Sequence, residues 1–70
     1  MNYIIIEMQT NNGQTAVVTP IPVYADPVEA EAVFLEKCAC ARRSGLPTHS
    51  VALLNQEGKV VARKSYSTGA

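Results

Sequence analysis

Residues 26–47 read DPVEAEAVFLEKCACARRSGLP and predict a single α-helix with a start signal and a stop signal. Asp26 has the side chain of an N-cap, and Glu29 follows it at the spacing of a capping box. Gly45 suits the left-handed residue that ends many helices, and Pro47 prevents the helix from continuing. We therefore expect one helix between these signals.

Two strand-like runs precede the predicted helix. Residues 3–9 are mostly apolar, and an Asn-Gly turn at residues 12–13 separates them from the run 14–24. Asn-Gly between two such runs is a strong hairpin signal. Pro20 and Pro22 have the same parity in the second run, so both missing N–H groups lie on one side of it. We therefore expect the second strand at an edge of the sheet.

Two more strand-like runs follow the helix and are joined by a Gln-Glu-Gly turn. They cover residues 50–55 and 59–66. This order of elements favours an α+β domain with two hairpins in one mainly antiparallel four-stranded sheet and the helix packed across one face. We expect residues 1–66 to form this single domain and residues 67–70 to be a frayed C-terminal tail.

The predicted helix has two apolar stripes, although a helix that rests on one sheet needs only one. At about 100° per residue, one stripe holds Val28, Ala32, Leu35 and Ala39, and the other holds Ala30, Phe34, Cys38 and Ala41. The strands also carry apolar residues on both faces, whereas a sheet covered by one helix is usually polar on its other face.

This excess of apolar surface predicts self-association. A chain of 70 residues buries only about 60% of the surface that its unfolded form exposes, so assembly would add stability. Contiguous apolar patches mark interaction sites. We expect a homo-oligomer, most simply a two-fold dimer, with Tyr3, Ile5 and Phe34 in the interface. The alternative is a curved sheet folded tightly about the helix, with scattered exposed apolar residues.

Charge is sorted along the chain, although the formal net charge is zero. Five acidic residues and no basic residue precede Lys37, whereas Glu57 is the only acid after it. The helix explains half of the charges, because acids at its start and bases at its end both stabilise the helix macrodipole. The alternative is an electrostatic docking surface.

Nucleic-acid binding is the alternative function that the charges allow. Arg42, Arg43, Lys59 and Arg63, with Tyr66 as a stacking ring, could form a modest phosphate-binding patch. The net charge of zero counts against this reading, because nucleic-acid-binding domains are usually basic.

No group of residues predicts an enzyme, a metal site or a cofactor. Cys38 and Cys40 point about 200° apart on the helix, so they cannot share a metal ion or a disulfide. His49 is the only histidine. It could act as a base for Ser44, Ser50 or a cysteine, but no third group that would orient it is evident. We therefore expect a non-enzymatic protein without a cofactor.

The sequence gives no sign of a membrane span or a signal peptide. The apolar run at residues 3–6 stops at Glu7 and has no basic segment before it. No run approaches the roughly 18 apolar residues that a spanning helix needs. Two cysteines without a disulfide framework also fit a reducing compartment, so we expect the protein in the cytoplasm.

Helix caps and turns over most of the chain match a known group of proteins. The matching residues are Tyr24-Ala25-Asp26, Glu29-Ala30-Glu31, Ser44-Gly45-Leu46-Pro47, His49, Leu53-Leu54, Glu57-Gly58 and Tyr66. In these features the chain resembles very small, functionally uncharacterised proteins of gut Firmicutes, some of them near prophage or mobile-element genes. The resemblance implies a free-standing bacterial domain with no assigned activity, and it carries over no functional residues. The mobile-element setting adds weight to a nucleic-acid-binding accessory or regulatory role as the alternative.

Overall fold

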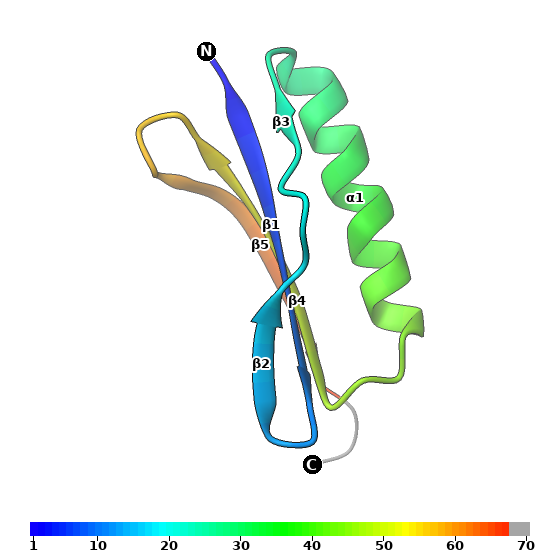
Figure 1. Cartoon of the computed structure of the whole chain (residues 1–70). Coiled ribbons are helices and arrows are strands. Elements are labelled where there is room, and N and C mark those ends of the chain that lie inside the picture. Colours follow the sequence, from blue (N-terminus) through cyan, green and yellow to red (C-terminus); the bar gives the residue numbers. More distant parts are fainter. Residues whose placement is uncertain (68–70) are drawn as a thin grey trace.

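In the part of the chain that the structure describes, five strands form one mainly antiparallel sheet, and one helix packs across it (Figure 1). The computed structural model describes residues 1–67. The predicted α+β class is confirmed; Ser67 belongs to the last strand, and the rest of the predicted tail lies outside the described residues. The elements are β1 (Tyr3–Asn11), β2 (Gln14–Val17), β3 (Val23–Tyr24), α1 (Pro27–Arg43), β4 (Thr48–Asn55) and β5 (Val60–Ser67).

The strand order is β2-β1-β4-β5, and every pairing is antiparallel. The β1–β2 hairpin turns at Asn12 and Gly13, which have φ of 54° and 77°. Positive φ at both positions is what a two-residue hairpin with a type I′ turn requires, so the predicted turn is confirmed. β1 and β4 are the central strands and pair from Tyr3↔Asn55 to Thr10↔Thr48.

The predicted strand 14–24 is two short strands on the same edge of β1. β2 pairs with the end of β1, and β3 pairs with its start. The segment between them contains Pro20 and Pro22, which cannot donate ladder hydrogen bonds. Two backbone bonds still hold this segment to β1, from Val18 N–H to Glu7 O at 2.8 Å and from Ile5 N–H to Pro22 O at 3.3 Å. The prolines therefore interrupt the strand without releasing it from the edge.

The helix begins and ends where its capping residues predict. The side chain of Asp26 accepts a hydrogen bond from the Val28 N–H at 2.9 Å, and Pro27 is the first helical residue. Gly45 follows the C-cap Ser44 with a φ of 72°, a conformation that glycine adopts without steric cost. These capping residues therefore set the length of the helix.

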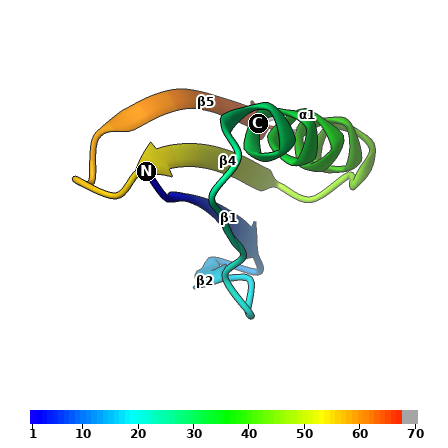
Figure 2. The same ribbon diagram turned by 90° about the horizontal axis from the view of Figure 1, so that it is seen from above.

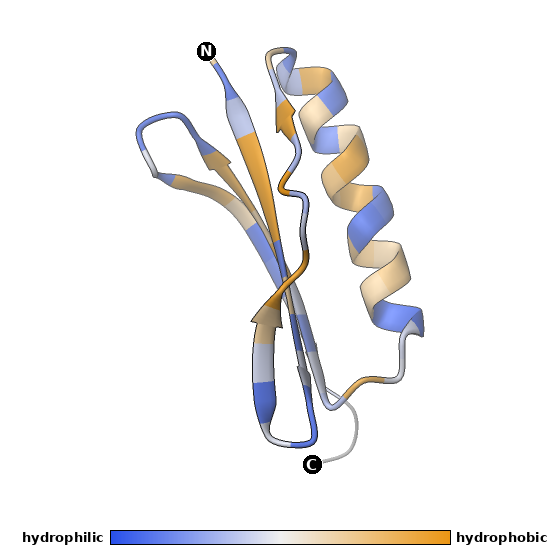
Figure 3. Cartoon of the chain, in the orientation of Figure 1, coloured by the Kyte–Doolittle hydropathy of each residue, from blue (hydrophilic) through white to orange (hydrophobic). Residues whose placement is uncertain are grey.

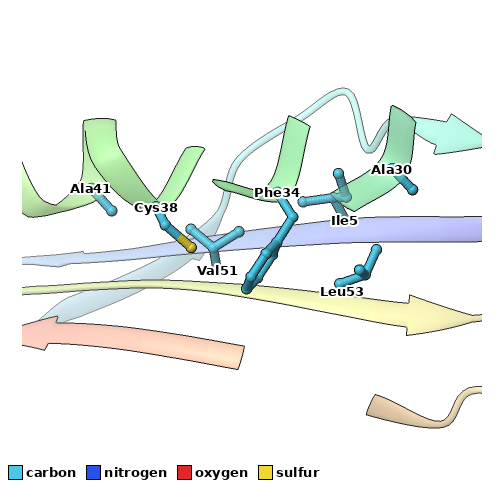
Figure 4. Close-up of a cluster of buried hydrophobic side chains, with 7 residues drawn as sticks. All are labelled: Ile5, Ala30, Phe34, Cys38, Ala41, Val51 and Leu53. Atoms are coloured by element: carbon cyan, nitrogen blue, oxygen red, sulfur yellow. The ribbon is translucent and has the colours of Figure 1, made fainter. Parts of the chain in front are cut away.

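One of the two apolar stripes of α1 faces the sheet and forms the core (Figure 4). The helix packs mainly against β4 and less against β1. From above, it lies on one side of the sheet, and no other described element covers the opposite side (Figure 2). The buried apolar residues are Ile5, Ala30, Phe34, Cys38, Ala41, Val51 and Leu53.

The core corrects the predicted interface. Ile5 and Phe34 are 1% and 4% exposed within a single chain, so neither is free to contact a second molecule. Tyr3 is half-buried and packs against the same core. Ile5 was misplaced because β1 is apolar on both faces, and it is the odd-numbered face that meets the helix. Phe34 was misplaced because the two helix stripes look alike in sequence.

Candidate functional site

The sheet has an open face that no described element covers. Successive side chains of a strand point to opposite faces, and directly paired residues share a face. Ile5, Val51 and Leu53 point toward the helix (Figure 4). The even-numbered residues of β1 and β4, and the residues paired with them, therefore form the open face.

One half of the open face is apolar, and we call it the open-face patch. A continuous row runs across four strands from Val23 through Ile4 and Leu54 to Val60. Figure 3 shows the apolar colouring of these strand segments. Val23 and Val60 are 58% and 51% exposed. The full patch is Ile4, Ile6, Met8, Val17, Val23, Ala52, Leu54 and Val60.

The other half of the open face carries hydroxyl groups. The Oγ1 atoms of Thr10 and Thr15 lie 2.8 Å apart across the β1–β2 hairpin. Arg63, paired with Ala52, is the one charged side chain that the described pairings place on this face. The open face is therefore almost uncharged. Its hydroxyl residues are Thr10, Thr15, Thr48, Ser50, Ser65 and Ser67.

The second apolar stripe of α1 is exposed. Val28 and Leu35 are 76% and 56% exposed, and Ala32 and Ala39 lie beside them. Charged residues border this stripe on both sides, because Glu31 and Arg42 flank one side and Glu36 and Arg43 the other. The stripe is therefore narrower than the open-face patch. Within a single chain, only the other apolar stripe is buried.

A polar cluster that the sequence did not reveal joins three elements beneath the end of the helix. His49, 3% exposed, places its Nε2 2.6 Å from Oε2 of Glu7 and its Nδ1 2.9 Å from Oγ of Ser44. Lys37 Nζ lies 3.4 Å from the other Glu7 oxygen. One signal for this cluster was present in the sequence, because alternate residues of a strand point to the same face. Glu7 shares the core-facing side of β1 with Ile5. His49 shares the core-facing side of β4 with Val51 and Leu53.

The order serine, histidine, glutamate is that of a nucleophile, a base and an orienting acid. In this cluster, however, the Ser44 hydroxyl donates its one hydrogen to the Ala41 carbonyl oxygen at 2.9 Å. His49 must then carry a hydrogen on Nδ1 and donate it to Ser44 Oγ. Nδ1 therefore has no free lone pair that could take a proton from the serine. The carbonyl end of a helix also repels a developing oxyanion. The geometry favours a structural role for this cluster, in which its side chains hold α1, β1 and β4 together.

The four basic residues of the nucleic-acid alternative are spread over the molecule. Arg42 and Arg43 lie in the last turn of α1, near the end of β5, and the Arg42 guanidinium lies 5.9 Å from the centre of the Tyr66 ring. Lys59 precedes the opposite end of β5, which at about 3.3 Å per residue is some 25 Å away. Arg63 lies on the open face. The structure therefore does not gather them into one patch.

The two cysteines differ in exposure, and we expect them to differ in reactivity. Burial raises the pKa of the Cys38 thiol, although the charge of Lys64 lowers it in part, whereas Cys40 is exposed. The thiolate is the reactive form. Ellman's reagent is expected to titrate one thiol in the native protein and both in guanidinium chloride. Cys40→Ser should remove the fast reaction, and two fast thiols in the native protein would contradict this assignment.

The described residues hold no cluster of three or more His, Cys, Asp or Glu side chains that could bind a metal ion. None of their helices is long and apolar enough to cross a membrane. Comparison of the chain with protein-family models, with curated proteins and with solved structures gave no significant match, so the resemblance to small bacterial proteins stays a prediction.

Proposed function

We propose that the protein is a small non-enzymatic interaction module that forms a homodimer through the open-face patch. The observation that carries the proposal is an apolar row across four strands, on a face that no described element covers. Sheets bury such faces against a helix layer or against a second sheet. The one helix of residues 1–67 packs on the other face, so a second copy can supply a layer on this face.

The size of the open face limits the strength of the proposed dimer. The whole structure extends 37 × 19 × 18 Å, so the open face can measure at most about 37 × 19 Å, or roughly 700 Å². Stable interfaces bury about 800 Å² on each partner. A dimer that buries most of the open face falls at the lower end of this range of interface sizes. Its affinity therefore depends on the apolar half of the face.

A second copy fits this face better than a charged partner does. In a two-fold interface the same patch meets itself, so it must be self-complementary. A face with one charged residue at Arg63 meets this condition, because few like charges come together. The formal net charge of zero also leaves no long-range repulsion between copies. The exposed stripe of α1, bordered by charges, is the less suitable surface.

The proposal predicts opposite results for two matched substitutions. Met8 lies in the open-face patch and is 38% exposed, and Leu35 lies in the outer helix stripe and is 56% exposed. Met8→Glu should weaken the dimer by at least about a hundredfold, because each copy would bury an unpaired carboxylate. Leu35→Glu should leave the dimer unchanged. Analytical ultracentrifugation over a range of concentrations would measure both dissociation constants.

The reverse result would overturn the proposal. Dissociation by Leu35→Glu with an intact Met8→Glu dimer would place the interface on the helix. Circular dichroism of both variants provides the control for folding. Each replaced side chain is already more than a third exposed, so each monomer should keep its structure.

A further inference from the structure

The two edges of the sheet are protected to different degrees. The β2–β3 edge is interrupted by Pro20 and Pro22. β5 forms the other edge, extends over eight residues and contains no proline. A strand at an edge presents a row of unpaired N–H and C=O groups, which a further strand can bind. β5 is therefore the edge at which a strand can be added.

The β5 edge is also positively charged. Arg63 and Lys64 lie in its middle and point to opposite faces, because they are adjacent in a strand. Arg42 lies over Tyr66 near its end. The one acid in residues 57–67 is Glu57, which lies in the turn before the strand. A strand added here would meet basic side chains on both of its faces.

A pocket at one end of this edge adds a polar site. It has a volume of about 400 Å³ and lies between the end of α1 and the last residues of β5. Arg42, Ser65 and Tyr66 are among its lining residues. An acidic side chain on a strand that extends past β5 would reach the guanidinium of Arg42 there. Charge and backbone geometry thus favour the same kind of ligand.

We propose that β5 binds an extended acidic peptide segment as an additional antiparallel or parallel strand. Main-chain hydrogen bonds to the free edge would supply affinity, and acidic side chains at neighbouring positions would pair with Lys64 on one face and Arg63 on the other. A second copy of the chain is the poorer occupant. Pairing β5 with its own copy would bring four positive charges and no negative charge to one short edge.

The peptide site shares Arg63 with the open face, but Lys64 lies outside the proposed dimer surface. Lys64 is paired with Val51 and so lies on the helix side of the sheet, opposite the open-face patch. Substitutions at Lys64 therefore test the peptide site without touching the proposed dimer interface. Failure of either proposal would leave the other standing.

The test is fluorescence polarisation with a labelled acidic peptide, TEVEEVET, matched in length to the eight residues of β5. We expect binding that weakens with added salt, and no binding of the basic peptide TKVKKVKT. Lys64→Glu should weaken binding by about fivefold or more. Arg43→Glu, which makes the same charge change at an exposed helix position outside the pocket, should have less than about a twofold effect.

Two further measurements separate strand addition from charge attraction alone. The acidic peptide methylated at alternate backbone nitrogens on its pairing edge should lose binding, because it keeps its charge but cannot donate hydrogen bonds. Bound peptide should also slow hydrogen exchange at alternate amides of β5, those that point away from β4. Equal binding of the methylated peptide, no change in exchange, or preference for an oligothymidylate of equal charge would overturn the proposal.

Discussion

Phe34→Ala is expected to leave the protein only marginally stable at room temperature, with up to about half of the molecules unfolded. Phe34 is 4% exposed and lies at the centre of the core, between α1 and the two central strands (Figure 4). Removing a buried phenylalanine side chain costs about 3–5 kcal/mol of the free energy of unfolding. Small domains have stabilities near the lower end of the usual range of about 5–15 kcal/mol. Far-UV circular dichroism and urea denaturation would measure the loss.

The neighbouring residue provides the matched control. Leu35 is 56% exposed, so Leu35→Ala should change the free energy of unfolding by no more than about 0.5 kcal/mol. Phe34→Leu keeps most of the apolar volume and should fall between the two. A Phe34→Ala protein as stable as Leu35→Ala would show that the other helix stripe forms the core.

His49→Ala is expected to cost about 3 kcal/mol of the free energy of unfolding. The ring is 3% exposed and binds Glu7 and Ser44, so its removal leaves a cavity and a carboxylate that has lost one partner. Breaking a buried pair by removing one partner is costly for this reason. Urea denaturation of the variant would measure the effect.

A double-mutant cycle tests whether the loss arises from the pair. Glu7→Ala and His49→Ala should show a coupling energy of about 1 kcal/mol or more, because the two side chains are in direct contact. Thr48→Ala, on the open face beside His49, should cost no more than about 0.5 kcal/mol and is the control. A coupling energy near zero would mean that the cavity alone explains the loss.

The sequence predicted the helix and the hairpins correctly because their signals are local. Asp26 and Gly45 lie at the ends that they mark, and Asn12-Gly13 forms the turn that its residues favour. Each depends on the backbone conformation of a few neighbouring residues. The break between β2 and β3 was missed because Pro20 and Pro22 were interpreted as features of one continuous edge strand.

The choice between the helix stripes could not be made from sequence. Both stripes have apolar residues at helical spacing, and only the packing against Ile5, Val51 and Leu53 shows which one is buried. Phe34 was misplaced for this reason, whereas Ile5 was misplaced because β1 is apolar on both of its faces. The expected excess of apolar surface remains, but it lies on Val28 and Leu35 and on the open face.

The polar cluster depends on contacts that are distant in the sequence. Glu7 and His49 are 42 residues apart, and they meet because β1 and β4 are neighbours in the sheet. His49 was considered with Ser44, but its acidic partner could not be identified without the strand order. Parity along each strand places both side chains on the core-facing side, but it does not show that they are neighbours.

The most direct test of the proposed dimer is the solution mass of the unmodified protein. Light scattering coupled to size exclusion, from high to low micromolar concentration at moderate salt, would measure it. The open-face patch predicts twice the chain mass of 7.5 kDa, with Met8→Glu reduced to the chain mass. A mass of 7.5 kDa for the unmodified protein at every concentration would contradict self-association.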